Sequence, residues 1–201
     1  MEKISDLIDF VATLPGLGPR SAKRIFFAMM RDKKRMMYRF SDLLKTAADT
    51  IVNCAECGSF DIVNPCKICT SSYRDKTKLC IVTEVGDLWN VEDSGHYDGY
   101  YYVFGGTLSA NQPSYVQINI DKLFAKIESV SDLQEIIIAT NATVENQTTA
   151  FFLIDNIREF LQKIDRKISI TTLGQGMPMG AELDYLDEGT IGAAFRGRKE
   201  I

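Results

Sequence analysis

The N-terminal quarter of the chain places its apolar residues at helical spacing. Over residues 3–13 they recur every three or four positions, which predicts a helix with one apolar face. Prolines and glycines interrupt this pattern between residues 14 and 19, and Pro19 suits the start of a second helix because its ring fixes φ. A third helix is predicted over residues 34–52, within which Ser41 and Asp42 are candidates for a break.

The pattern changes beyond residue 53. Four cysteines fall in a loop-like stretch that runs to about Tyr73, and short apolar runs then alternate with amphipathic segments. Alternation of this kind predicts an α/β unit with a mostly parallel sheet. The predicted strands are "KLCIVTE", "YDGYYYVFGG", "EIIIAT" and "KISITTLG"; the predicted helices are "VGDLWNVEDSG", residues 120–129 and residues 144–162.

These patterns predict an α+β chain of several units in series. Helices occupy residues 1–53, the cysteine module residues 54–77, and the α/β unit residues 78–175. A loop and a final helix follow in a tail over residues 176–201.

Composition narrows the class of protein. The chain has 201 residues, 45% of them hydrophobic and 25% charged, which is typical of a soluble globular protein. No apolar run reaches the roughly 18 residues of a membrane span, so no membrane partner is expected. The first residues lack the basic and apolar layout of a secretory signal, and a cytoplasmic location is therefore expected.

The charge of the chain is unevenly distributed. The net charge is −4, but the segment from Gly16 to Arg39 holds eight basic residues and one acidic residue. Such asymmetry favours a surface for a polyanion, such as DNA. The alternative is a solvated helix surface without a partner.

The stretch "LPGLGPRSAKR" links the first two predicted helices. Gly16 and Gly18 permit backbone conformations that let a phosphate approach the main chain. The amides at the start of the next helix carry the positive end of its dipole, and Arg20, Lys23 and Arg24 add charge. This combination resembles the helix-hairpin-helix element, which grips DNA phosphates without reading bases. The alternative is a plain turn between two helices.

Two cysteine pairs indicate a metal site. Cys54 and Cys57 form one Cys-x-x-Cys pair, Cys66 and Cys69 the other, and two such pairs can surround Zn²⁺ as a tetrahedron. Four protein ligands leave no open position, so the predicted role is structural. A disulfide or redox role is the alternative, although an odd count of five cysteines without a signal peptide argues against a disulfide framework. Cys80 is predicted to be a buried core residue.

Three acidic residues are candidates for a second site. Glu84 ends the first predicted strand of the α/β unit, Asp87 follows on the next turn, and Glu145 follows the third strand. Since the carboxyl ends of parallel strands share one edge of a sheet, these acids could hold Mg²⁺ for phosphoryl chemistry. The alternative is an acidic surface with another use.

Taken in order, these motifs resemble the bacterial recombination mediator family RecR over nearly the whole chain. The hairpin resembles its helix-hairpin-helix signature, and the cysteine pairs match its zinc module. The stretch beginning "LCIVTEVGDLWNVEDSG" resembles the start of its Toprim domain, and "LGQGMPMGAELDYLDEGTIGAAFRGR" resembles its end.

The resemblance implies a DNA-binding accessory protein of recombinational repair that is not an enzyme. Members of the family assemble into dimers or tetrameric rings through their N-terminal and C-terminal regions, which implies a role in oligomerisation for the tail over residues 176–201. They act with RecO, and often with RecF, to load RecA onto single-stranded DNA, and the Toprim acids are taken to lie near the partner-binding surface.

The chain departs from catalytic Toprim domains at one informative place. These carry Asp-x-Asp after the third strand, whereas this chain has Asn141, Ala142 and Thr143. The missing acids favour the non-enzymatic interpretation, because metal chemistry needs its ligands. The alternatives are a Mg²⁺-dependent Toprim-type nuclease or primase that uses Glu84, Asp87 and Glu145, and a protein scaffold that binds no DNA.

Overall fold

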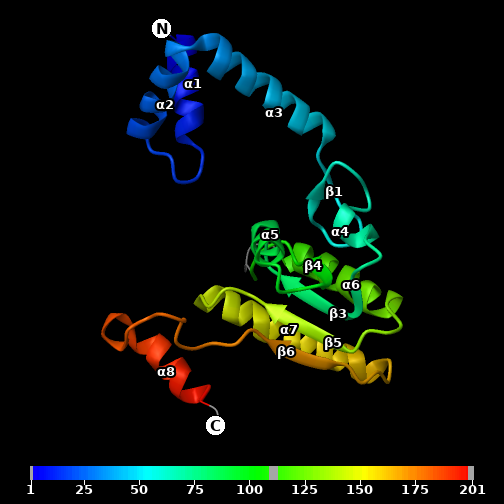
Figure 1. Cartoon of the computed structure of the whole chain (residues 1–201). Helices are drawn as coiled ribbons and strands as arrows, with labels where there is room; N and C mark the ends of the chain where they lie inside the picture. Colours follow the sequence, from blue (N-terminus) through cyan, green and yellow to red (C-terminus); the bar gives the residue numbers. More distant parts are fainter. Residues whose placement is uncertain (1, 109–112, 199–201) are drawn as a thin grey trace. The chain divides into compact units, whose positions relative to one another are not determined.

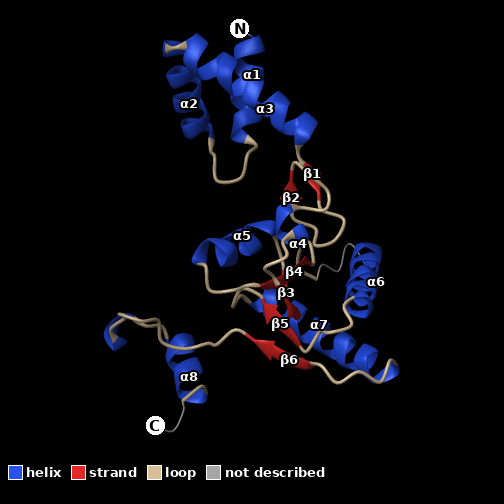
Figure 2. Ribbon diagram, turned by 45° about the vertical axis from the view of Figure 1, so that its right-hand side comes forward, coloured by secondary structure: helices blue, strands red, loops and turns tan. Residues whose placement is uncertain are grey.

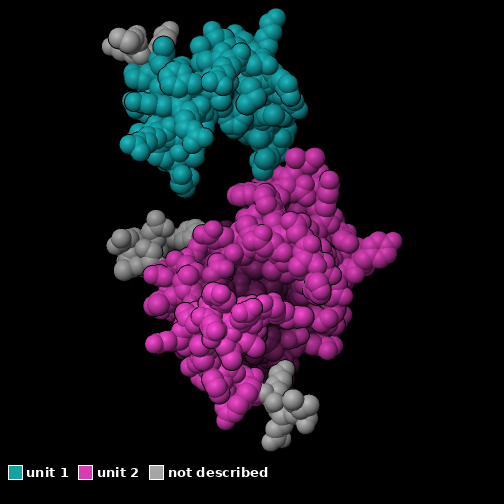
Figure 3. Space-filling view, turned by 60° about the vertical axis from the view of Figure 1, so that its left-hand side comes forward, with its two compact units in different colours: residues 1–51 teal, residues 52–201 magenta. Residues whose placement is uncertain are grey.

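The computed structural model describes residues 2–108 and 113–198. The chain divides into two compact units, Met1–Ile51 and Val52–Ile201, which Figure 3 shows in different colours. Each unit is described by itself below. The predicted division into four segments stays a prediction.

The first unit consists of helices (Figure 1). The two predicted helices before residue 32 are confirmed as α1 (Glu2–Ala12) and α2 (Pro19–Arg31), with Pro19 in the first turn as expected. The third helical segment begins as a π-helical stretch, η1 (Lys33–Tyr38), and continues as α3 (Arg39–Thr50). The predicted break at Ser41 and Asp42 is wrong.

The helix continues through these two residues for a physical reason. The backbone stays helical where η1 meets α3, with φ of −65° and ψ of −46° at Tyr38, so Asp42 lies inside a continuous helical segment. The irregularity lies earlier, at η1, where the Asp32 carboxylate accepts a hydrogen bond from the Arg35 amide at 3.0 Å. Among the described residues of this unit, only Ala22 and Phe26 are buried hydrophobics. The first unit therefore has a small core.

The second unit opens with the cysteine module. β1 (Val52–Asn53) pairs antiparallel with β2 (Phe60–Asp61), and the short helix α4 (Lys67–Thr70) follows. With so few apolar residues of its own, the module depends on other interactions to fold.

A four-stranded parallel sheet forms the centre of the second unit (Figure 2). Its strands are β3 (Asp75–Val82), β4 (Gly99–Val103), β5 (Glu135–Ala139) and β6 (Ser169–Thr172), in the order β4-β3-β5-β6. The connecting helices are α5 (Val85–Ser94), α6 (Pro113–Ser129) and α7 (Val144–Lys163). The predicted α/β alternation is confirmed.

Two boundaries differ from the sequence-based expectation. β3 begins at Asp75 rather than Lys78, because Asp75 already pairs with Gly99 of the neighbouring strand. α6 begins at Pro113 rather than residue 120, and proline is well placed in a first helical turn. The predicted close of α5 is confirmed: Gly95 has φ of 67°, a left-handed conformation that glycine adopts without strain.

The sheet is covered on both faces. One face packs against α6 and α7 through a core that includes Ile81, Ile136 and Leu153. The other face packs against α5 and the cysteine module, and here Cys80 is buried with Leu88, as predicted for that thiol. Burial on both faces explains why β3 reads as a continuous apolar run.

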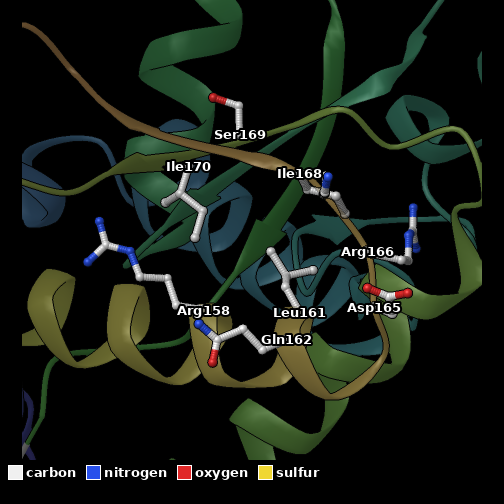
Figure 4. A pocket seen from close by; sticks show the side chains of 9 residues that line it. Arg158, Leu161, Gln162, Asp165, Arg166, Ile168, Ser169 and Ile170 are labelled. Carbon is white, nitrogen blue, oxygen red and sulfur yellow. The ribbon is translucent and has the colours of Figure 1, made fainter.

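A turn at the far end of the sheet is fixed by one arginine. Arg166 donates hydrogen bonds to the carbonyls of Ile127 at 2.7 Å and Val130 at 2.8 Å, at the end of α6. Beside it lies a groove of about 610 Å³ between α7 and β6, across which Leu161 and Ile170 face each other (Figure 4). Both apolar and charged side chains line the groove. The guanidinium group of Arg166 is already occupied by its hydrogen bonds to the carbonyls at the end of α6.

The chain leaves β6 as an extended segment and ends in η2 (Leu183–Tyr185) and α8 (Glu188–Arg196). Neither element has a buried residue, so the tail has no core of its own. No helix in the described part of the chain is long and apolar enough to cross a membrane.

Candidate metal centre and nucleic-acid interface

The four cysteines of the module converge on one point. The sulfurs of Cys54, Cys57, Cys66 and Cys69 all lie within 4.8 Å of one another. The Sγ atoms of Cys57 and Cys66 are 3.6 Å apart, and those of Cys54 and Cys69 are 3.8 Å apart. Zn–S bonds of about 2.3 Å in a tetrahedron place the sulfurs about 3.8 Å apart. The cluster therefore has the donor set and the size of a four-thiolate metal site.

The thiols of the cluster differ in acidity because they interact with one another. Hydrogen bonding from Cys69 is the main reason that the pKa of Cys57 is lowered to about 6. Burial is the main reason that the pKa of Cys66 is raised to about 11. The pKa of Cys69 is also raised, chiefly through its hydrogen bond to Cys57. The Cys57 thiolate thus forms readily, and a metal ion must displace protons from Cys66 and Cys69.

The cysteine module is attached directly to the sheet. The Cys57 carbonyl accepts a hydrogen bond from the Val103 amide at 2.7 Å, at the end of β4. Gly58 packs so closely that a Cβ atom there would lie 3.3 Å from both Cβ and O of Val103. Glu56 also forms an ion pair with Lys126 of α6, at 2.5 Å. These contacts connect the metal cluster rigidly to the α/β unit.

The loop between α1 and α2 has a backbone geometry suited to phosphate binding. Gly16 has φ of 77°, and a side chain at this conformation would be strained. Gly18 is the N-cap of α2 in an extended conformation, and its carbonyl accepts the first helical hydrogen bond from Ala22 at 3.0 Å. Within the described residues, the amides of Gly16, Gly18, Arg20 and Ser21 donate no main-chain hydrogen bond. These donors are available to an anion at the helix N-terminus.

The predicted basic side chains flank these amides. Arg20, Lys23 and Arg24 are all exposed on α2, and the spacing of three and four residues puts Lys23 and Arg24 beside Arg20 on the helix surface. The first turn of α2 holds no acidic residue. The structure thus brings the five predicted hairpin residues into one exposed, positively charged loop and helix start.

The predicted acids lie at the carboxyl end of the sheet, but in different roles. Glu84 is the N-cap of α5, and Asp87, in the first turn, accepts hydrogen bonds from the Glu84 amide at 3.1 Å and the Thr83 hydroxyl at 2.9 Å. The other Asp87 oxygen accepts a hydrogen bond from the Asn141 amide group at 3.3 Å. Hydrogen bonds from neighbouring groups therefore engage both carboxylate oxygens of Asp87.

Glu145 lies in the first turn of α7 and is exposed. In the described part of the chain, the four cysteines form the one group of three or more potential ligands close enough to hold a metal ion. Glu84, Asp87 and Glu145 do not come together in this way. The geometry does not support the Mg²⁺ site considered from the sequence.

Two residues with roles in these sites could not be predicted from the sequence. Asn141 lies where catalytic Toprim domains carry an acid. Its side-chain amide donates a hydrogen bond to Asp87, which is 54 positions earlier in the chain. Lys126, the partner of Glu56, is 70 positions away from it. Neither pairing follows from local spacing, so only the topology of the sheet reveals them.

Comparison with known proteins agrees with this arrangement over the whole chain. The sequence model "RecR, helix-hairpin-helix" matches residues 4–48, "Toprim domain" matches residues 77–173, and "RecR, C-terminal" matches residues 176–199. The recombination protein RecR of Maricaulis maris is 42% identical over 200 residues, covering 99% of this chain and 96% of its own length. That of Orientia tsutsugamushi (strain Ikeda) is 42% identical over 198 residues, covering 98% and 94%. That of Neorickettsia sennetsu is 38% identical over 201 residues, covering 100% and 99%.

Proposed function

Because the chain belongs to the RecR family of recombination proteins, we propose that it is a DNA-binding mediator of recombinational repair. The observation that carries the proposal is the hairpin between α1 and α2. Its amides that donate no main-chain hydrogen bond, and the cations beside them, can bind a phosphate group. Contacts of this kind do not distinguish base sequences, so binding is expected to be general and sensitive to salt.

The test is a salt titration of DNA binding. Fluorescence anisotropy with labelled oligonucleotides of unrelated sequences should give similar dissociation constants that rise steeply with salt. Single-stranded and duplex probes of equal length establish which form is preferred. Strong preference for one sequence, or binding that ignores salt, would refute phosphate gripping by the hairpin.

We propose Zn²⁺ as the metal of the cysteine cluster, in a structural role. Four thiolates and tetrahedral spacing suit zinc, and the full set of protein ligands leaves no open position for chemistry. Bound metal would supply folding free energy to a module that lacks an apolar core of its own. Elemental analysis of protein purified without chelators tests this directly, and less than one zinc per two chains would count against it.

We propose that the chain acts as a homo-oligomer, a dimer or a tetrameric ring. On α3, Phe40, Leu43 and Leu44 are each about half exposed at helical spacing, and they present an apolar surface with no partner in the described part of the unit. The tail likewise exposes Leu183 and Phe195. Several linked hairpins would turn weak phosphate contacts into useful affinity. Light-scattering mass with and without DNA measures the number of copies.

The proposed partners are RecO and possibly RecF, which would together load RecA onto single-stranded DNA in the cytoplasm. We assign Glu84, Asp87 and Glu145 to a partner-binding surface rather than to catalysis. The assignment is supported by Asn141, which occupies with an amide a position where catalytic Toprim domains carry an acid. Charge reversal at Glu84 should weaken RecO or RecF binding in a pull-down and leave DNA binding intact. Cleavage or synthesis of labelled DNA with Mg²⁺ or Mn²⁺ that disappears in Glu84→Gln would favour the enzyme instead.

A further inference from the structure

One cysteine of the metal cluster differs from the other three in its exposure. Cys54, Cys57 and Cys66 are at most 3% exposed, whereas Cys69 is half-buried. Because a bound metal ion deprotonates its thiol ligands outright, their relative reactivity depends on access and on hydrogen bonding. Exposure therefore singles out Cys69 as the ligand that an outside reagent can reach.

A hollow beside Cys69 gives a small molecule access to this cysteine. This cysteine borders a hollow of about 440 Å³ between the cysteine module, β4 and the end of α6. Thr70 and Tyr100 contribute to its wall, and its charged residues are of both signs: Lys76, Asp132 and the ion pair of Lys126 with Glu56. The hollow is polar and large enough to admit a small molecule such as hydrogen peroxide to Cys69.

Hydrogen bonding also distinguishes Cys69 from Cys54, whose sulfur lies 3.8 Å away. The Cys54 sulfur accepts a hydrogen bond from the Cys66 amide at 3.3 Å. Among the described residues, no amide donates to the Cys69 sulfur. An N–H donor draws electron density from a thiolate, so Cys69 keeps the more nucleophilic sulfur of this pair.

We propose that Cys69 is an oxidation site through which hydroperoxides open the metal centre, with Cys54 as the resolving residue. The Cys69 thiolate attacks one peroxide oxygen; an S–O bond forms, the O–O bond breaks, and the leaving alkoxide or hydroxide takes a proton from water. The Cys54 sulfur, 3.8 Å from that of Cys69, then attacks the sulfenic sulfur and expels hydroxide. The two thiolates together lose two electrons, the peroxide gains two, and a Cys54–Cys69 disulfide results.

The consequence follows from the ligand count. A disulfide between Cys54 and Cys69 leaves only Cys57 and Cys66 as thiolates, and two ligands do not hold Zn²⁺ in a tetrahedral protein site. Oxidation would therefore release the metal, and reduction would allow it to bind again. This inference rests on the zinc assignment of the proposed function.

The experiment uses the full-length, metal-loaded chain and hydrogen peroxide. A chromophoric chelator follows zinc release, while samples quenched with an alkylating reagent are digested and analysed by mass spectrometry. We expect Cys69 to be the first oxidised cysteine and a peptide linking Cys54 to Cys69 to appear as zinc is released. First modification at Cys54, Cys57 or Cys66, or a disulfide joining Cys57 to Cys66 alone, would overturn the proposal.

Two matched variants separate reactivity from metal affinity. Cys69→His and Cys66→His each leave three thiolates and one imidazole, which is also a zinc ligand set. We expect release about tenfold slower than in the native chain for Cys69→His and unchanged for Cys66→His, since only the former lacks the reactive sulfur. Equal rates in both variants would refute the role of Cys69.

Metal content distinguishes this inference from the zinc assignment. A native chain that holds no zinc before treatment contradicts both. A chain that holds zinc but is first oxidised elsewhere contradicts only the oxidation site. Cys80→Ser serves as a further control, because Cys80 is buried in β3 outside the cluster and its loss should leave the release rate unchanged. If a histidine variant fails to fold, the order of modification in the native chain still decides the question.

Discussion

The side-chain amide of Asn141 donates a hydrogen bond to Asp87 Oδ1 at 3.3 Å, joining the segment that follows β5 to the first turn of α5. An aspartate at position 141 would place two carboxylates against each other and remove this bond. We expect Asn141→Asp to lower the free energy of unfolding by about 1–2 kcal/mol, through like-charge repulsion and the absence of the donor. Urea unfolding measures the change. Asn141→Ala removes only the donor and should cost less; an equal or larger cost would contradict the repulsion.

The hairpin predicts a uniform effect on DNA binding. Lys23→Ala and Arg24→Glu should weaken binding to every sequence alike, because the proposed contacts of these exposed cations are with phosphates rather than bases. The slope of log K against log salt should become shallower by about 0.9 for each phosphate of duplex DNA that a variant no longer neutralises. Lys167→Ala, an exposed lysine of the second unit, is the matched control. Unchanged affinity and slope in both hairpin variants would show that DNA binds elsewhere.

Metal binding to the cysteine cluster should release protons. At pH 8 the Cys57 thiol, with its pKa lowered to about 6, is already ionised in the metal-free chain, whereas Cys66 and Cys69 have raised pKa values and keep their protons. Zinc binding should thus release at least two protons, and its apparent affinity should fall as the pH falls. Titration calorimetry in buffers of different ionisation enthalpy counts the protons, and a count near zero would contradict the prediction.

The same pKa values set how the stability of the metal-free chain depends on pH. The folded-state pKa of Cys57 is depressed, so its thiolate stabilises the fold at alkaline pH, and this contribution is lost as the pH falls from about 9 through about 6. The raised pKa of Cys66 acts in the opposite sense, and its contribution is lost as the pH rises through about 11. Unfolding of chelator-treated protein across this range tests both signs.

Gly58 should be intolerant of substitution. It has φ of 80°, and an added Cβ would press on Val103 at 3.3 Å. We expect Gly58→Ala to destabilise the chain by about 1–3 kcal/mol and to weaken zinc binding, because the strain lies beside Cys57. Gly86→Ala is a suitable control, since nothing lies within 4 Å of an added Cβ and its φ is ordinary. Similar stability in the two variants would contradict the argument.

The order of elements could be predicted from the sequence because it depends on local spacing. Periodicity indicates α2 and the parallel strands, and the spacing of the paired cysteines indicates one cluster. The π-helical η1 could not be predicted, since its apolar spacing differs little from that of an α-helix. The partners of Asp87 and Glu56 were also missed, because contacts 54 and 70 positions apart are set by topology.

The bond from the Val103 amide to the Cys57 carbonyl has a consequence for solubility. β4 is the outermost strand on its side of the sheet, and an outermost strand with free amides invites pairing with another chain. The cysteine module lies beside this edge and blocks the addition of a strand from another chain. If the module needs the proposed zinc to fold, removing the metal with a chelator should expose the edge, and the chain should then aggregate through β4 before the sheet itself unfolds.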